Sequence, residues 1–224
     1  MEWMVKFWQG FLLNVQNIFM PCETNIFINC PFDNHYKILL RPLLFTSIYF
    51  GLELLISQTH SSATIRINQI KDHIRASKFS IHDLSRSKPM RKNELPRFNM
   101  PYALGLDIGC AEFGIKKFKE KKILILETDR FHYQKVLSDI SGQDIESHDN
   151  DPATLIKKFR NWLSTVDKSK SYPSGNFVWR AYNQFYDDVS KTLISKHFTE
   201  EEIEDMPVSD FINFSRVWII KLTS

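Results

Sequence analysis

The sequence predicts a small doubly wound α/β domain with a parallel sheet, followed by a C-terminal helical extension. Three observations support this fold class. Short runs of continuous apolar residues are typical of strands that are buried on both faces. These runs alternate with helical segments, which is the pattern of parallel βαβ units. The chain has 224 residues, of which 43% are hydrophobic and 25% charged, and this is sufficient for a sizeable core.

The alternating elements lie between residues 25 and 166, which we expect to form the domain. Asp151 and Pro152 are the expected N-cap and first residue of its last helix. The expected strands are the apolar runs 26–28, 54–56, 79–84 and 123–127. The expected helices cover residues 36–51, 64–77, 102–113 and 152–163.

The two ends of the chain carry a surplus of aromatic residues, out of 18 Phe, 7 Tyr and 5 Trp in total. Residues 1–24 form an N-terminal extension, residues 167–176 are a linker by composition, and residues 177–224 are expected to be helical. We expect some of the rings to pack the C-terminal helices onto the domain. Others are expected to form the interface of a homo-oligomer or of a complex with a partner protein. The surplus rings are Trp3, Phe7, Trp8, Phe11, Phe177, Trp179, Tyr182, Phe185, Tyr186, Phe211, Phe214 and Trp218.

Charge and cysteine content narrow the class of protein. A formal charge of +3 is too small to indicate a nucleic-acid partner. Cys22, Cys30 and Cys110 are odd in number and have no His at metal-ligand spacing, so we expect free thiols in a reducing cytosol and no metal site.

Polar residues interrupt the apolar stretches 1–20 and 38–56, so neither is expected to span a membrane. The absence of G-x-G-x-x-G and Walker sequences disfavours a Rossmann dehydrogenase or a P-loop enzyme.

The candidate site residues lie in three loops that meet at the carboxyl edge of such a sheet, where doubly wound proteins bind ligands. The third loop, residues 98–105, leads into a helix N-terminus, which favours anionic groups. Arg66, on the helix expected over 64–77, is a candidate phosphate ligand. The first two loops contribute Asn29, Pro31, Phe32, His82, Asp83 and Arg86.

Each candidate also has a structural interpretation. Asp83 is either a catalytic or ribose-binding carboxylate or a residue that organises its loop, and His82 is more often a structural histidine than a base. Arg66 either reaches a phosphate or belongs to a solvated helix face. The lysine-rich run 116–122 is expected to be an exposed turn. Five basic side chains of the second loop either hold nucleotide phosphates or are solvated. They are Arg86, Lys88, Arg91, Lys92 and Arg97.

Five segments, taken in order, resemble a bacterial TIR-like family that is related in fold to nucleoside 2-deoxyribosyltransferases. They are IFINCPFD, RINQIKDHIRAS, FSIHDLSR, LPRFNMPYALG and KKILILE, and the resemblance covers roughly residues 25–163. A later stretch, residues 138–145 with His148, is also similar to the family. The resemblance implies a flavodoxin-like or TIR-like sheet and an enzyme that cleaves the nicotinamide–ribose bond of NAD(P) in bacterial antiphage defence. It implies NAD as the substrate without a further cofactor, and an oligomer as the active form.

The chain departs from this family at Ala103. Related families have a catalytic Glu in a Glu-Leu-Gly sequence at the corresponding place, where this chain has Ala-Leu-Gly. A carboxylate near the anomeric carbon would stabilise the oxocarbenium-like state of N-ribosyl cleavage. The resemblance also places Asp83, Asn99 and Tyr102 around the ribose. Asp107 and Glu112, further along the same helix, are expected to face solvent. For Asp107, which lies one turn beyond Ala103, the alternative is that its side chain faces the pocket.

Two explanations of Ala103 are open: a natural protein that binds without turnover, or an inactive Glu-to-Ala variant, which the intact surrounding pattern favours. The leading hypothesis is therefore an NAD(P) N-glycosidase that is inactive as written. The alternatives are a hydrolase of nucleosides or nucleotides that is similar to deoxyribosyltransferases, and a non-catalytic nucleotide-sensing module.

Overall fold

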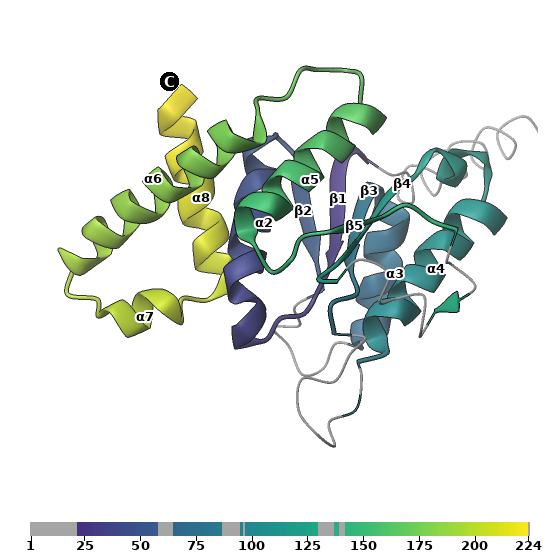
Figure 1. Cartoon of the computed structure of the whole chain (residues 1–224), viewed down its shortest axis with the longest axis horizontal. Helices are drawn as coiled ribbons and strands as arrows, with labels where there is room; N and C mark the ends of the chain where they lie inside the picture. Colours follow the sequence, from purple (N-terminus) through teal and green to yellow (C-terminus); the bar gives the residue numbers. More distant parts are fainter. Residues whose placement is uncertain are drawn as a thin grey trace, which may run out of the picture.

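The computed structural model describes residues 22–57, 65–86, 95, 97–129, 137–138 and 142–223. It confirms the predicted fold class, because five parallel strands form one sheet with helices on both faces (Figure 1). The strand order is β2-β1-β3-β4-β5, the order of flavodoxin-like doubly wound sheets. The strands are β1 (Cys22–Asn29), β2 (Glu53–Ile56), β3 (Ser77–Asp83), β4 (Lys122–Glu127) and β5 (Ile145–Ser147).

Four strands coincide with the predicted apolar runs. Most residues of β3 are buried, whereas the edge strand β2 is only half-buried. Ile26, Phe27 and Ile28 of β1 are at most 1% exposed. The strand β5 was not predicted. Its three half-buried residues pair with the carboxyl half of β4 but contain no apolar run, so the sequence carries no strand signal at this place.

Nine helical segments lie within the described ranges. The helices α2 and α5 cover one face, and α3 and α4 cover the other (Figure 1). The helices are α2 (Lys37–Tyr49), α3 (Arg66–Ala76), α4 (Asn99–Phe113), α5 (Pro152–Val166), α6 (Gly175–Ile194), α7 (Glu200–Glu204) and α8 (Val208–Thr223), with the short 3-10 segments η1 (Asn34–Tyr36) and η2 (Lys116–Glu120).

Alternate residues of β1 pack against opposite layers, as the two-residue period of a strand requires. Phe27 packs with residues of α3 and α4, whereas Ile26 and Ile28 belong to the core that includes α2 and α5. At the start of α5 the predicted cap is confirmed, because Asp151 Oδ2 accepts a hydrogen bond of 2.7 Å from the backbone N–H of Thr154.

The C-terminal helices pack against α2 through aromatic rings, as expected from the surplus of rings in this part of the chain. The ring of Phe45 on α2 lies 5.5 Å from Tyr182, 5.0 Å from Phe185 and 6.0 Å from Trp218, measured between centroids. Such contacts add to the area that is buried. The aromatic residues of the N-terminal extension, Trp3, Phe7, Trp8 and Phe11, lie outside the described residues.

The prediction that no apolar stretch spans a membrane can be compared with the helices of the structure. Among the described parts of the chain, no helix combines the length and the apolar character that crossing a bilayer requires.

Candidate functional site

The strand order creates a switch point between β1 and β3. From β1 the sheet continues to β2 on one side, and from β3 it continues to β4 and β5 on the other. The loops that leave the carboxyl ends of β1 and β3 therefore diverge, and doubly wound proteins bind ligands in the crevice between such loops. Asn29 ends β1 and Asp83 ends β3. The predicted residues of the first two loops thus share one edge of the sheet.

Asp83 is the centre of a buried polar cluster at this edge. Its Oδ2 accepts hydrogen bonds from the Tyr36 hydroxyl at 2.5 Å and from His148 Nε2 at 3.0 Å, and its Oδ1 accepts one from the backbone N–H of Ser85 at 2.8 Å. Burial alone would raise the pKa of Asp83, but the hydrogen bonds outweigh it and lower the pKa below its usual value. Asp83 is therefore an ionised carboxylate that fixes three segments of the chain, which is the loop-organising interpretation.

The partners of His148 determine which of its ring nitrogens carries the proton. The backbone N–H of Asn150 donates to His148 Nδ1 at 3.2 Å, so in the neutral ring the proton is on Nε2. That nitrogen donates to Asp83 and also lies 3.1 Å from Ser85 Oγ. Because Nε2 already carries a proton, it cannot accept the proton of the Ser85 hydroxyl. These three residues therefore do not form the triad of a serine hydrolase.

An ion pair joins the two loops of the switch point. Arg86 donates from Nη2 to Asp33 Oδ1 at 2.6 Å and from Nε to Asp33 Oδ2 at 3.2 Å. Arg97 Nη1 lies 3.6 Å from the same carboxylate. A bidentate pair of this kind fixes the geometry of both loops. Arg86 thus connects the loops in this structure, and its contact with a phosphate stays a prediction. The other basic residues expected in this loop, Lys88, Arg91 and Lys92, lie outside the described residues.

Arg66 is the one described candidate cation at this edge that lies in no ion pair with the described residues. It is the first residue of α3, is exposed, and forms no ion pair with the described part of the chain. Its guanidinium carbon lies 6.0 Å from the centroid of the Phe32 ring. Pro31, which precedes Phe32, is buried. An exposed guanidinium beside an aromatic ring is suited to an anion that carries a planar group, such as a nucleotide.

The first turns of α4 bring together the third group of candidates. Asn99 and Tyr102 are exposed, while Ala103 is fully buried in a cluster with Phe27, Ile70 and Ile74. Asn29 Nδ2 donates to the carbonyl of Met100 at 3.1 Å, which holds the start of α4 at the carboxyl edge of β1. Side chains of a helix lean toward its N-terminus. A longer side chain at position 103 would therefore extend toward this edge.

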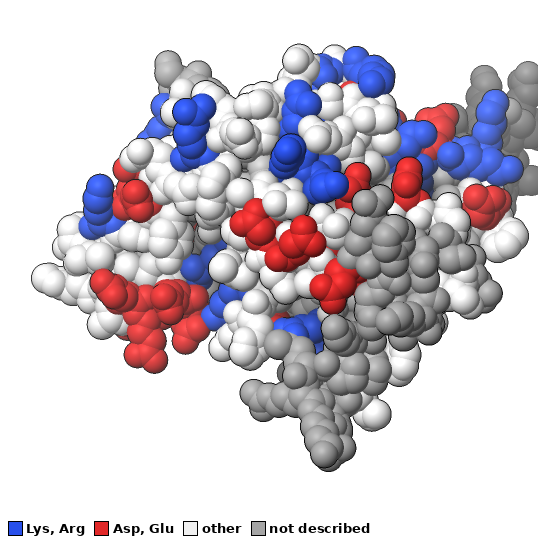
Figure 2. Space-filling model, in the orientation of Figure 1, with Lys and Arg blue, Asp and Glu red and all other residues white. Residues whose placement is uncertain are grey.

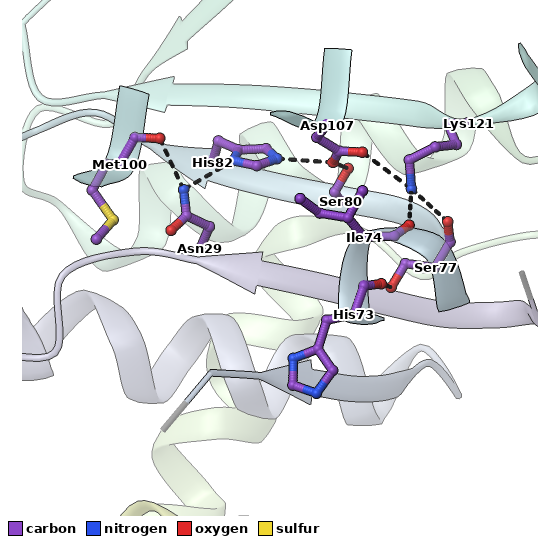
Figure 3. A network of polar contacts seen from close by, with 9 residues as sticks. All are labelled: Asn29, His73, Ile74, Ser77, Ser80, His82, Met100, Asp107 and Lys121. Carbon is purple, nitrogen blue, oxygen red and sulfur yellow. Dashed lines mark hydrogen bonds and ion pairs between the residues drawn. The ribbon is translucent and has the colours of Figure 1, made fainter. Parts of the chain in front are cut away.

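Figure 3 shows a chain of buried polar groups that runs from this edge to the opposite end of β3. Asn29 Nδ2 lies 2.9 Å from His82 Nδ1, and His82 Nε2 lies 2.9 Å from Asp107 Oδ2. Since the Asn29 amide donates to Nδ1, the proton of the neutral His82 ring is on Nε2 and is donated to Asp107. His82 is fully buried and both of its nitrogens have partners. These contacts agree with its structural interpretation.

The far end of this chain is a buried ion pair. Lys121 Nζ lies 3.2 Å from Asp107 Oδ1 and donates to the carbonyls of Ile74 at 2.7 Å and Ser77 at 2.6 Å. Ser80 Oγ donates to Asp107 Oδ2 at 2.5 Å. Burial would raise the pKa of Asp107, but His82, Lys121 and Ser80 together lower it. The carboxylate and the ammonium group compensate each other inside the protein.

Two expectations about these residues are wrong. Asp107 does not face solvent, because it is four residues from Ala103 and therefore lies on the same, sheet-facing side of α4, where it is fully buried. Glu112 is exposed as expected. Lys121 does not belong to an exposed turn: it is 7% exposed, because its ammonium group reaches inward to Asp107.

Tyr36 and His148 complete the Asp83 cluster but are not among the predicted site residues. Tyr36 begins an apolar helix and was assigned to it, and His148 follows the unpredicted strand β5. Local pattern gave no signal for either contact, since His148 and Asp83 are 65 residues apart.

Cys30, next to Asn29, is buried, and burial together with the Asp83 charge raises the pKa of its thiol. It is therefore not an activated nucleophile.

Comparisons of the chain with protein-family models, with curated proteins and with solved structures gave no match. The functional argument for this site therefore depends on its geometry and on the sequence resemblance.

Proposed function

We propose that the chain binds NAD or a closely related nucleotide at the carboxyl edge of β1 and β3. The proposed reaction of this site is cleavage of the nicotinamide–ribose bond, in the context of bacterial antiphage defence in a reducing cytosol. The observation that carries the proposal is the β1/β3 switch point with Arg66 beside Phe32 at its edge.

The side chains at this edge match the parts of such a ligand. Arg66 offers a charge-assisted contact to the pyrophosphate, and Phe32 offers a ring face next to it. Asn99 and Tyr102 are exposed at the start of α4 and are the proposed contacts of the ribose. The Asp33–Arg86 pair and the Asp83 cluster hold the loops in place, and we assign them this positioning role.

In this proposal the chain as written binds its ligand without turnover. Ala103 supplies no carboxylate, and Asp83 is buried and occupied by its hydrogen bonds. A Glu at position 103 would extend from above Phe27 toward Asn29, two residues further along β1, a distance of about 7 Å at the usual rise of a strand. There it would stabilise the positive charge that develops on the ribose as the C1′–N bond breaks. Nicotinamide leaves as a neutral molecule with the bonding electron pair, and water then adds to C1′ and releases a proton.

Calorimetric titration of the chain with NAD tests the binding step. Arg66→Ala is expected to weaken binding at least tenfold, since it removes the proposed phosphate contact. Arg75→Ala is the matched control, because Arg75 carries the same charge on the same helix but lies in its last turn. Its expected effect is less than twofold. The proposal fails if the chain gives no binding to NAD, or if both substitutions weaken binding equally.

A second candidate function is a nucleotide-sensing module that never cleaves its ligand. The specific observation in its favour is that no described carboxylate at this edge is free: Asp83 has three donors, and Asp33 is paired with Arg86. This candidate and the glycosidase differ in what happens when a Glu is placed at position 103. The remaining alternative, a nucleoside hydrolase, predicts release of a purine or pyrimidine base instead of nicotinamide.

A further inference from the structure

A hollow lies between α2, α6 and α7. Asn34, which follows Asp33 of the switch-point loop, also lines it, but none of the proposed nucleotide contacts does. The volume of the hollow is about 450 Å³, which is within the range of small-molecule sites. One wall is a row of three aromatic rings on α6, Trp179, Tyr182 and Tyr186, at helical spacing. The opposite wall is formed by Ile38 and Pro42 of α2.

The three rings of this wall lie next to one another, one pair stacked and the other tilted. Trp179 and Tyr182 lie 5.6 Å apart with an interplanar angle of 20°, and Tyr182 and Tyr186 lie 6.4 Å apart with an angle of 37°. The inner ring, Tyr182, also packs on Phe45 of the core. This contact holds the Tyr182 ring in place. An aromatic wall suits a planar ring.

Several polar groups of the hollow have no partner among the described residues. The Trp179 indole N–H, the Tyr186 hydroxyl and the Glu204 carboxylate take part in none of the hydrogen bonds or ion pairs within that part of the chain. Burial raises the pKa of Tyr182, so its hydroxyl stays neutral. The hollow therefore combines ring faces with uncommitted donors and one free carboxylate.

Both cations of the hollow contact the C-terminal end of α7. Lys37 Nζ lies 2.6 Å from Asp205 Oδ1, and Arg41 Nη2 donates to the carbonyls of Ile203 at 3.0 Å and Glu204 at 2.7 Å. These contacts tie the C-terminal end of α7 to α2. Acidic side chains gather over α7, as Figure 2 shows. The lining of the hollow itself carries two cations, Lys37 and Arg41, and two carboxylates, Glu204 and Asp205, so its formal charge is balanced.

We infer that this hollow binds a nucleoside moiety, that is, a planar base together with its ribose. The base stacks on Trp179 and the neighbouring tyrosine rings, as bases do on aromatic side chains in other proteins. The Glu204 carboxylate accepts hydrogen bonds from the ribose hydroxyls, as acidic residues do in dinucleotide-binding folds. This site is separate from the switch point, and the inference does not depend on the proposed function. The moiety is either a free nucleoside or the adenosine end of a dinucleotide.

Calorimetric titration with adenosine tests the inference. The chain is expected to bind adenosine, Trp179→Ala to weaken binding at least tenfold, and Trp179→Phe to keep most of it because a ring face remains. Phe177→Ala is the matched control, since Phe177 is exposed on the same helix but does not line the hollow. Glu204→Gln is expected to weaken binding several-fold, and Glu201→Gln, on the same short helix outside the hollow, less than twofold.

Further titrations distinguish the two sources and the two sites. If Trp179→Ala also weakens NAD binding, the site takes the adenosine end of a dinucleotide. If only adenosine is affected, the site takes a free nucleoside. The inference is overturned if adenosine does not bind or if Trp179→Ala has no effect. It is equally overturned if Arg66→Ala weakens adenosine binding as much as Trp179→Ala does, since adenosine would then occupy the switch point.

Discussion

Removal of Lys121 should destabilise the protein strongly, because it leaves a carboxylate unpaired in the interior. The side chains of Lys121 and Asp107 are both 0% exposed, and Nζ lies 3.2 Å from Oδ1. Coulomb's law at an effective dielectric constant of about 20 gives about 5 kcal/mol for this separation. Breaking buried pairs by substitution of one partner costs about 3–5 kcal/mol in other proteins. We therefore expect Lys121→Met to lower the free energy of unfolding by about 3–5 kcal/mol.

Urea unfolding followed by circular dichroism measures this loss. Lys119→Met is the matched control, because Lys119 is an exposed lysine two residues away and its substitution should change the free energy of unfolding by less than about 0.5 kcal/mol. The double variant Asp107→Asn/Lys121→Met removes both charges. It should be more stable than the sum of the two single effects predicts, by about 1–3 kcal/mol.

The same pair gives a dependence of stability on pH. The pKa of Asp107 is lowered in the folded protein, so the unfolded chain takes up the proton first as the pH falls. The stability contributed by this carboxylate is fully present above the unfolded pKa of about 3.9 and is lost as the pH falls through the lower, folded pKa. In Lys121→Met the folded pKa rises, so this loss at acid pH should become smaller. The reasoning is refuted if Lys121→Met unfolds at the same urea concentration as the parent chain, or if the two single effects are simply additive.

Two further predictions concern the edge cluster and the glycines. Tyr36→Phe removes one donor to the buried Asp83 carboxylate, so it should lower the free energy of unfolding by about 1–3 kcal/mol. Acid unfolding, followed by circular dichroism, should then occur at higher pH. An unchanged midpoint of acid unfolding would contradict the assigned hydrogen bond. Gly175→Ala should destabilise the protein by about 1–3 kcal/mol in thermal unfolding, because the added Cβ would lie 2.9 Å from Lys157 Cα. Gly105→Ala should stabilise α4 by about 0.5–1 kcal/mol, because an added Cβ would meet no atom within 4 Å. Equal effects of the two substitutions would contradict the packing described.

The sheet could be predicted from sequence because its strands carry a local signal. Continuous apolar runs mark β1 to β4, and most side chains of β3 and of the carboxyl half of β4 are buried between the two helical layers. The strand β5 lacks this signal because its three residues include one apolar side chain, Ile145, whereas β2, also a half-buried edge strand, has three in a row. Its place is determined by pairing with β4, a contact that no local pattern encodes.

The candidate site was predicted in part for the same reason. Asn29 and Asp83 could be located because they end predicted strands, and parallel strands end at one edge. Tyr36 and His148 could not, because their contacts with Asp83 depend on how distant segments fold back onto this edge. Asp107 did carry a usable signal, its four-residue spacing from Ala103, but a charged residue on a helix is more often solvated.

The most direct test of the proposed function is release of nicotinamide from NAD by the Ala103→Glu variant, measured by chromatography. The account predicts that this variant folds, binds NAD and releases nicotinamide, whereas the parent chain and the isosteric Ala103→Gln variant bind NAD and release none. A folded Ala103→Glu variant that binds NAD but produces no nicotinamide would contradict the glycosidase and leave the sensing module. Failure of both variants to fold would also contradict the account, since it requires space for a glutamate between Phe27 and the carboxyl edge of β1.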